Sequence, residues 1–222
     1  MCFSSSASFL AAVIAGGAGV FALSGVRRPA EIPLASLPLV LAGQQAVEGL
    51  LWRKLAHGPE TTDTGALSLS FLLLAEFLWP VLVPMAAYLA EPREDRRRLM
   101  APWLALGSVI GAYLLWVLVS EPHAASISGS RIDYVTHPYE GRLVALGYAA
   151  ATILPLLHSS HRWITALGLI VLTGLLVSYF AYREALVSVW CYFATLGSGV
   201  VAMHFTLPRA ERAAPPRGLP AR

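Results

Sequence analysis

The sequence predicts an all-α, polytopic membrane protein: a bundle of seven transmembrane helices with the amino end outside and the carboxyl end inside. Three observations predict this fold. Hydrophobic residues make up 56% of the 222 residues and charged residues 13%, about half of the ~25% that soluble domains carry. The clustered charges leave seven apolar stretches, each of about the 18–25 residues that a bilayer span needs. The basic residues also fall unevenly between alternate connections.

The expected spans are residues 7–26, 34–56, 65–90, 100–120, 140–157, 163–182 and 184–206. The first has no preceding basic residue and no small-residue cleavage site, so we expect a retained helix rather than a signal peptide. The last two are separated only by Arg183 and Glu184. Strands of a membrane barrel need only about 9–11 residues and alternate in polarity, which favours helices here. Residues 1–207 are therefore expected to form one domain, followed by a disordered basic cytoplasmic tail over 208–222.

Orientation follows from the placement of arginine and lysine, which concentrate on the cytoplasmic side of membrane proteins. With the amino end outside, the inner segments hold most of the 16 basic residues. They are Arg27, Arg28, Arg93, Arg96, Arg97, Arg98, Arg162, Arg209, Arg212, Arg217 and Arg222. The net charge of +3 is thus explained by cytoplasmic anchors, and it does not indicate nucleic-acid binding.

Two glutamates, Glu48 and Glu76, lie inside the second and third spans. A carboxyl group at membrane depth is costly and usually has a functional role. Counted from the outer ends of their helices, they lie about 12 Å and about 16 Å deep at 1.5 Å per residue. Because the two spans are antiparallel neighbours with a short connection, we expect the carboxyls to approach each other and to be the catalytic candidates. The competing interpretation is a structural hydrogen-bond network between helices.

The second span carries further polar residues on the same face as Glu48. Gln44, Gln45 and Trp52 fall within about 100° of it at 3.6 residues per turn. Lipid cannot satisfy such a face, so it must turn toward protein or a cavity. In the third span, Pro80 follows Glu76 by four residues and removes a helical hydrogen bond, which predicts an opened backbone beside Trp79.

Other candidate ligand-binding residues lie at the same outer level, while the inner half is almost free of ionisable groups. They are His137, Tyr139, Tyr148, Trp190 and Cys191. This asymmetry predicts a cup that opens outward rather than a path across the membrane. Cys191 is expected to be a packed thiol, with a disulfide to Cys2 as the alternative. No segment has metal-ligand spacing, so we expect neither a metal nor a cofactor.

Several short motifs resemble an uncharacterised family of bacterial multispan membrane proteins that begin Met-Cys-Phe-Ser-Ala. The resembling residues are Met1-Cys2-Phe3-Ser4, Arg27-Arg28-Pro29, Gln44-Gln45-x-x-Glu48-Gly49, Glu76-x-x-Trp79-Pro80 and Trp190-Cys191. This chain has Ser5 where the family usually has alanine. The resemblance implies a multi-pass protein of the bacterial inner membrane and supports the chosen residues, but it implies no reaction.

Three functions remain open from the sequence. The first is a binding protein whose outward-facing acidic and aromatic pocket holds a small, mostly apolar ligand. The second is a membrane-embedded acid–base enzyme, such as an isoprenoid (terpenoid) cyclase or isomerase that uses a protonated glutamate. The third is a structural subunit of a membrane complex. The expected partners are the lipid bilayer and this hydrophobic ligand, with no nucleic acid; the sequence leaves the identity of any protein partner open.

Overall fold

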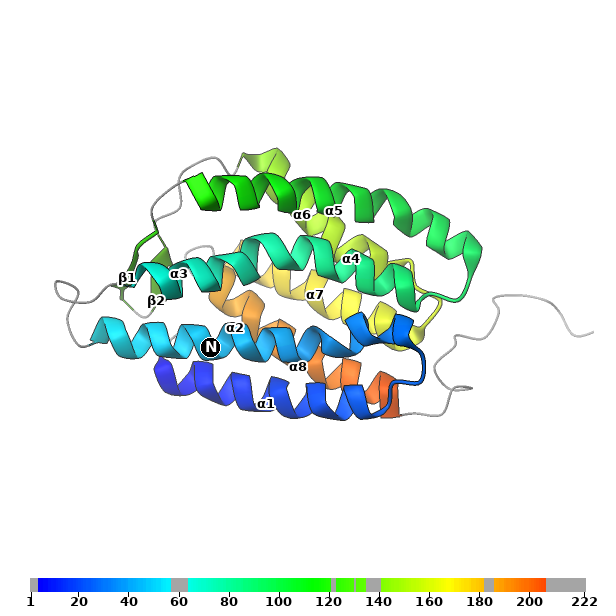
Figure 1. The fold of residues 1–222 in the computed structure, drawn as a ribbon, viewed down its shortest axis with the longest axis horizontal. Coiled ribbons are helices and arrows are strands. Elements are labelled where there is room, and N and C mark those ends of the chain that lie inside the picture. Colours follow the sequence, from blue (N-terminus) through cyan, green and yellow to red (C-terminus); the bar gives the residue numbers. More distant parts are fainter. Residues whose placement is uncertain are drawn as a thin grey trace, which may run out of the picture.

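The computed structural model describes residues 4–56, 64–120, 123–129, 131–134, 141–181 and 186–206. These residues form seven helical rods that run side by side along the long axis of the molecule (Figure 1). The rods are α1 (Ser5–Ser24), α2 (Ile32–Ala56) with the short 3₁₀ helix η1 (Pro29–Glu31) before it, the continuous run of α3 (Gly65–Leu72), η2 (Leu73–Leu78) and α4 (Trp79–Ala90), then α5 (Glu94–Ser120), α6 (Arg142–Leu157), α7 (Arg162–Ala181) and α8 (Leu186–Thr206).

Each expected span falls on one rod, and the predicted helical fold is confirmed. Helix α5 starts at Glu94, ahead of the expected span at residue 100. Its first turn is charged, with Glu94 paired to Arg97 and Arg98, so the helix extends beyond its apolar part. The expected tail over 208–222 lies outside the described residues.

Five of the rods are long and apolar enough to cross a membrane: Ser5–Ser24, Pro29–Ala56, Gly65–Ala90, Glu94–Ser120 and Arg162–Phe180. Within the described residues, Arg142–Leu157 and Phe193–Thr206 are apolar but shorter. Large apolar side chains also point out of the bundle, among them Val13, Val109, Leu143 and Phe180. An exposed apolar surface of this kind suits a lipid environment. The rods thus have the features of a membrane protein.

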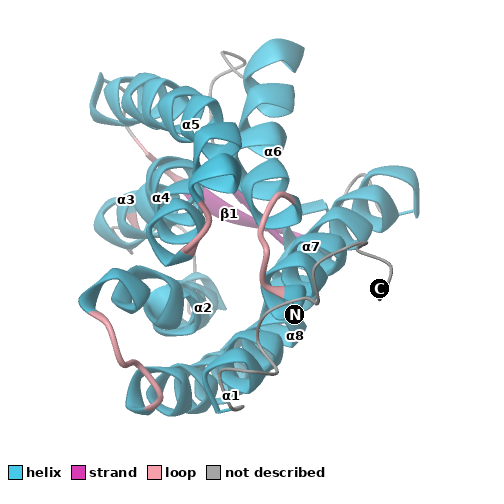
Figure 2. Ribbon diagram, turned by 90° about the vertical axis from the view of Figure 1, so that its right-hand side faces the viewer, coloured by secondary structure: helices cyan, strands magenta, loops and turns pink. Residues whose placement is uncertain are grey.

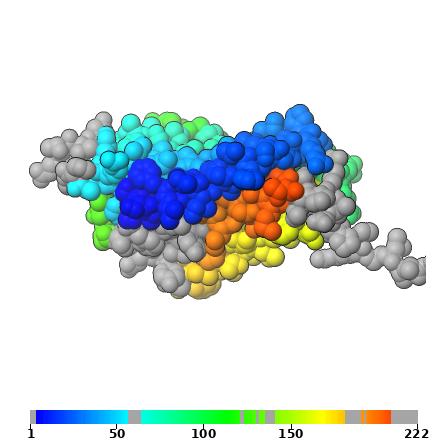
Figure 3. All heavy atoms as spheres, turned by 90° about the horizontal axis from the view of Figure 1, so that it is seen from below, coloured from blue at the N-terminus to red at the C-terminus, as the bar shows by residue number. Residues whose placement is uncertain are grey.

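Viewed along the rods, α1, α2 and α8 lie on one side of the bundle and α5 and α6 on the other (Figure 2). Helix α4 contacts α2, α5 and α6, and α7 contacts α6 and α8. Figure 3 shows α1 and α8 forming much of one long face. Helices far apart in sequence therefore line a common interior.

A short antiparallel hairpin, which the sequence analysis did not predict, covers one end of the bundle. Strand β1 (Ala125–Ser128) pairs with β2 (Arg131–Tyr134) in the register Ala125↔Tyr134, and Gly129 in the turn has a φ of 61°. The Tyr134 ring stacks on Phe71 of α3 with centroids 4.6 Å apart. We call this the hairpin end of the molecule.

A buried carboxylate fastens the opposite end, which we call the Glu91 end. Glu91 follows α4 and is 2% exposed. It accepts hydrogen bonds from the Ser160 N–H at 2.7 Å, the Ser160 hydroxyl at 2.5 Å, the Ser159 hydroxyl at 3.2 Å and the Arg93 N–H at 3.1 Å. The connection between α4 and α5 is thereby tied to the one between α6 and α7.

Two apolar cores support the rods between these ends. The core at the Glu91 end joins α1, α2, α4, α5, α6, α7 and α8 around Phe205, Met100 and Leu34. The core at the hairpin end joins α2, α3, α5 and the hairpin around Trp52, Phe71 and Leu118. Helix α2, which carries Gln44, Gln45 and Glu48, contributes to both cores.

Candidate functional site

The polar residues of α2 lie on its buried face. Glu48 is 1% exposed, Gln45 0%, Gln44 3% and Trp52 8%. The four positions recur at helical spacing, so the four side chains share one face of α2. The face turns into the bundle rather than out of it.

One hydrogen bond joins this face to the neighbouring rod. The indole N–H of Trp79, at the start of α4, donates to the side-chain oxygen of Gln44 over 2.6 Å. The sequence places the two residues 35 positions apart, and the antiparallel run of α2 and α4 brings them together. An amide and an indole that both need partners away from water thus satisfy each other.

This bond fixes the relative depth of the two acids. Glu48 lies four residues from Gln44 toward the hairpin end, which is about 6 Å along the helix. Glu76 lies three residues from Trp79 in the same direction, about 4.5 Å at the same rise. The two carboxyl-bearing residues are therefore at about the same level, on the hairpin-end side of the bond.

The two acids have different surroundings. Glu48 accepts a 3.4 Å hydrogen bond from the hydroxyl of Ser8 on α1, and Ser8 is itself 0% exposed. Glu76 is half-buried on η2. Glu48 is thus enclosed between α1 and α2, whereas Glu76 borders more open space.

The expected opening of the backbone beside Pro80 takes the form of a π-helix. Residues Leu73–Leu78 form this segment, and α4 begins directly after it. In a π register the carbonyl of Ala75 would accept from residue 80, which is a proline without an N–H. The Tyr148 hydroxyl of α6 donates to that carbonyl over 2.6 Å instead. π-Helical turns are rare and often occur at functional sites.

Helix α5 lies directly against this irregular turn. A Cβ atom added at Gly107 would come within 1.9 Å of the Pro80 carbonyl oxygen, and one at Gly111 within 3.1 Å of the Phe77 oxygen. Only glycine permits the approach at Gly107. The π turn is consequently held from α6 by a hydrogen bond and from α5 by close backbone packing.

The contacts continue from α6 to α8. The Tyr148 ring meets the Trp190 ring edge to face, with centroids 5.9 Å apart. Gln44, Trp79, Tyr148 and Trp190 therefore form a series across α2, α4, α6 and α8. The link between Trp79 and Tyr148 is indirect: Tyr148 bonds the carbonyl of Ala75, which lies four residues before Trp79 on the same rod. We call these four residues the polar–aromatic belt.

Cys191 follows the last member of this belt in sequence. It is a free, buried cysteine, and its carbonyl accepts the Thr195 hydroxyl at 3.0 Å. The disulfide alternative involved Cys2, which lies outside the described residues. His137 and Tyr139, the other two candidate pocket residues, lie outside them as well.

Some buried polar atoms near Glu48 lack any hydrogen-bond partner within the described part of the chain. They are both side-chain polar atoms of Gln45, the indole nitrogen of Trp52 and the hydroxyl of Ser68. Leaving a buried group of this kind unpaired costs about 1–3 kcal/mol. Such atoms in a native protein need an explanation, such as water or a ligand.

Two buried serines of the candidate site, Ser8 and Ser68, were not predicted from the sequence. Ser8 partners Glu48 from 40 positions away, and Ser68 lies on the α3 face that packs on Trp52 through Phe71 and Leu72. A serine at the start of an apolar helix is the only signal that the sequence offers. Hydroxyls there usually bond their own backbone, and Ser70 does so with the Ala66 carbonyl at 2.8 Å.

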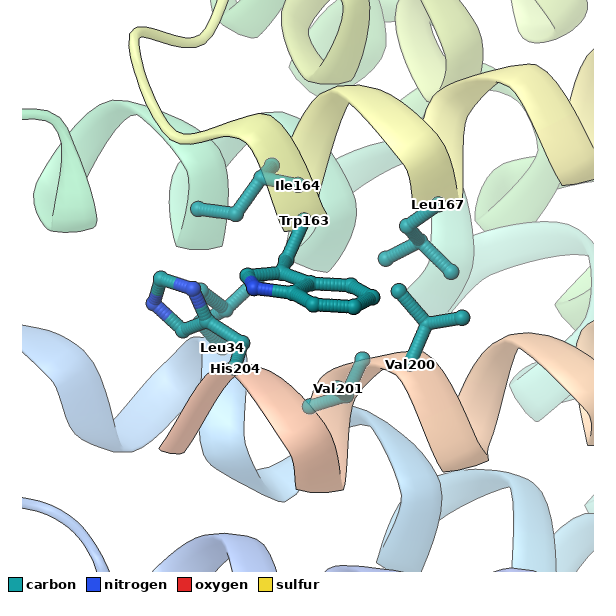
Figure 4. A pocket seen from close by; sticks show the side chains of 7 residues that line it. All are labelled: Leu34, Trp163, Ile164, Leu167, Val200, Val201 and His204. Atoms are coloured by element: carbon teal, nitrogen blue, oxygen red, sulfur yellow. The ribbon is translucent and has the colours of Figure 1, made fainter. Parts of the chain in front are cut away.

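A small hollow lies at the Glu91 end, between α2, α7 and α8 (Figure 4). Trp163, His204 and five aliphatic side chains line it, and its volume of about 10 Å³ suffices for about one water molecule. The His204 ring lies 5.1 Å from the His161 ring, centroid to centroid. Across the described ranges, no group of three or more His, Cys, Asp or Glu residues is placed to hold a metal ion.

Comparison with known proteins gives a family but no activity. The model of a family of unknown function (DUF6629) matches residues 1–217. No curated protein and no solved structure matches the chain. The match covers the whole bundle, including the belt and both acids, and it agrees with the uncharacterised family that the sequence motifs indicate.

Proposed function

The chain belongs to the DUF6629 family of unknown function, and we propose that it binds a small, mostly apolar ligand in an outward-facing pocket of the bacterial inner membrane. All seven rods would then span the bilayer, with the amino end outside and the carboxyl end inside. The basic residues support this orientation, since Arg27, Arg93, Arg96 and Arg162 all lie at the Glu91 end. The hairpin end would face outward.

One observation carries the proposal: Glu48 is 1% exposed inside an apolar helix, at the level of the belt that joins four helices. A buried carboxyl is expensive to maintain. Ligand sites in helical bundles are typically apolar, with a few converging polar groups. The arrangement around Glu48 has that composition.

The pocket residues would contact different parts of the ligand according to their chemistry. Glu48 and Gln44 would fix the polar end of the ligand, while Trp79, Tyr148 and Trp190 would pack against its apolar part. Glu76 would border the ligand from η2, where its side chain is half-buried. The apolar core at the Glu91 end would close the bottom of the pocket.

Native mass spectrometry of the protein purified in lipid nanodiscs tests the proposal. We expect an apolar small molecule to co-purify with the wild type and to be lost from Glu48→Gln, while the melting temperature shows that the variant still folds. Glu94→Gln is the matched control because Glu94 has a 63% exposed side chain at the other end. A wild type that carries no such molecule, or a Glu48→Gln variant that retains it, contradicts the proposal.

A membrane-embedded acid–base enzyme is the second candidate, and the π turn favours it. Glu76 lies on that turn, one turn before Trp79, and the edge-to-face pair of Tyr148 and Trp190 lies beside it. A protonated Glu76 could protonate an isoprenoid alkene, and the aromatic faces would stabilise the cation. Incubation with isoprenoid substrates tests this; unchanged turnover in Glu76→Gln excludes the role.

A further inference from the structure

We infer that the ligand's polar end is an uncharged hydroxyl group, seated against Gln45 and Trp52 beside Glu48. This inference rests on the proposed function and names the ligand class for that same site. The class is an aliphatic or isoprenoid alcohol, as distinct from an acid, an amine, an ester or an ether.

The Gln45 amide is the observation that leads to it. Gln45 is 0% exposed, and neither its side-chain oxygen nor its side-chain nitrogen has a hydrogen-bond partner in the described structure. One turn before it along the chain, Leu41 is buried as well, so the amide has no route to water along α2. This side chain offers one acceptor oxygen and two N–H donors, so it suits a group that both donates and accepts hydrogen bonds.

Trp52 supplies a further donor on the same face. Its indole N–H is buried and also lacks a partner among the described residues, and it lies seven residues, about two helical turns, from Gln45. Glu48 lies between them. Together the three residues extend over about 10 Å of α2 at 1.5 Å per residue.

This part of α2 adjoins the seam between α1 and α2. A Cβ atom added at Gly49 would lie 2.9 Å from the Phe9 ring of α1, and one added at Gly16 of α1 would lie 3.7 Å from the Ala42 Cβ. Ser8 of α1 donates to Glu48. Helix α1 lies at the outside of the bundle along this seam (Figure 3). A ligand would reach Gln45 through the hairpin end of this seam, which faces outward in the proposed orientation.

Neither a negative nor a positive charge on the ligand suits these side chains. An anionic head group would lie against the Glu48 carboxyl, and the basic residues of α2, Arg53 and Lys54, are exposed in its last turn. A cationic head group would suit Glu48 but would leave the N–H groups of Gln45 and Trp52 facing another donor. A neutral head group avoids both costs.

Among neutral groups, a hydroxyl matches the unpartnered atoms best. Its oxygen accepts from the Trp52 indole or the Gln45 amide nitrogen, and its proton is donated to the Gln45 oxygen. An ether or ester oxygen only accepts, so it leaves the Gln45 oxygen unpaired. A site built to pair with a hydroxyl discriminates strongly against the analogue that lacks it.

Competition binding in phosphatidylcholine nanodiscs tests the inference. The probe is tritiated dodecan-1-ol, with empty nanodiscs subtracted, and the competitors are unlabelled dodecan-1-ol, dodecyl methyl ether, dodecanoate and dodecylamine. We expect the alcohol to bind about tenfold or more tightly than each of the other three, because each leaves a buried group unpaired.

The variant Gln45→Leu separates recognition from folding. We expect it to weaken dodecanol binding about tenfold and to reduce the preference over the ether, with an unchanged or higher melting temperature because it removes an unpartnered buried amide. Ser70→Ala, which alters an exposed hydroxyl bonded to its own helix, should change neither quantity.

The outcomes distinguish this inference from the proposed function. If all four compounds bind equally well, or if Gln45→Leu leaves the preference for the alcohol intact, the inference is wrong and the apolar pocket remains. If no saturable binding of any compound is found above empty nanodiscs, both fail.

Discussion

The indole nitrogen of Trp79 donates to the side-chain oxygen of Gln44 over 2.6 Å, and this bond sets α2 against α4 at one register. Glu48 and Glu76 both lie toward the hairpin end from it. A slip of one turn along either helix would separate the acids by about 5.4 Å in depth. The register that includes this contact therefore places the two carboxyl-bearing residues at a common level.

The first prediction concerns that contact. Gln44→Leu should lower the unfolding free energy by about 1–3 kcal/mol because the partly buried Trp79 N–H loses its acceptor. The double variant Gln44→Leu/Trp79→Phe should lose less than the sum of the single losses. Unfolding in mixed micelles, followed by circular dichroism, measures both. Strictly additive losses would show that the bond contributes nothing.

The second prediction concerns the π turn. Tyr148→Phe should cost about 1–3 kcal/mol because the Ala75 carbonyl then has no donor from α6. The same unfolding assay measures it, with Tyr179→Phe as a control at a residue that is 47% exposed. Equal effects in the two variants would indicate that the Ala75 carbonyl finds another donor.

The third prediction concerns the packing of α5 on the π turn. Gly107→Ala should destabilise the fold by about 1–3 kcal/mol, because its methyl group would lie 1.9 Å from the Pro80 oxygen. Gly17→Ala is the matched control, since nothing lies within 4 Å of the added atom there. That variant should be neutral or more stable by up to about 1 kcal/mol. Similar melting temperatures for the two variants would argue against the close approach.

The fourth prediction concerns the Glu91 end. Glu91→Ala should cost about 3 kcal/mol or more because four donors lose a shared acceptor. Glu94→Ala removes only exposed ion pairs and should cost at most about 1 kcal/mol. Proteolysis at the α6–α7 connection provides an independent measurement. It should become faster in the first variant alone.

Much of the helical fold is readable from the sequence because apolar length determines it. Gly65–Ala90 coincides with the expected third span, and the effect of Pro80 on the backbone follows from its missing N–H. The hairpin at Ala125–Tyr134 was not predicted, because its strands are four residues each and depend on Phe71 for packing.

The site is readable only in part, for a related reason. Helical spacing groups Gln44, Gln45, Glu48 and Trp52 on one face, since that is a local property of α2. Their partners come from other helices: Ser8 bonds Glu48 from 40 positions away, and Trp79 bonds Gln44 from 35 away. Such long-range pairing depends on packing, and one sequence does not specify it.

Cysteine labelling from each side of the membrane tests the outward-facing pocket most directly. In a chain with Cys2→Ser and Cys191→Ala, Glu76→Cys should react with a small, membrane-impermeant methanethiosulfonate added to spheroplasts. It should not react when the reagent is added to inside-out vesicles. Ser108→Cys, an exposed position on α5, is the lipid-facing control and should react in neither. Reaction of Glu76→Cys only in inside-out vesicles, or in neither preparation, would contradict a pocket that opens to the outside.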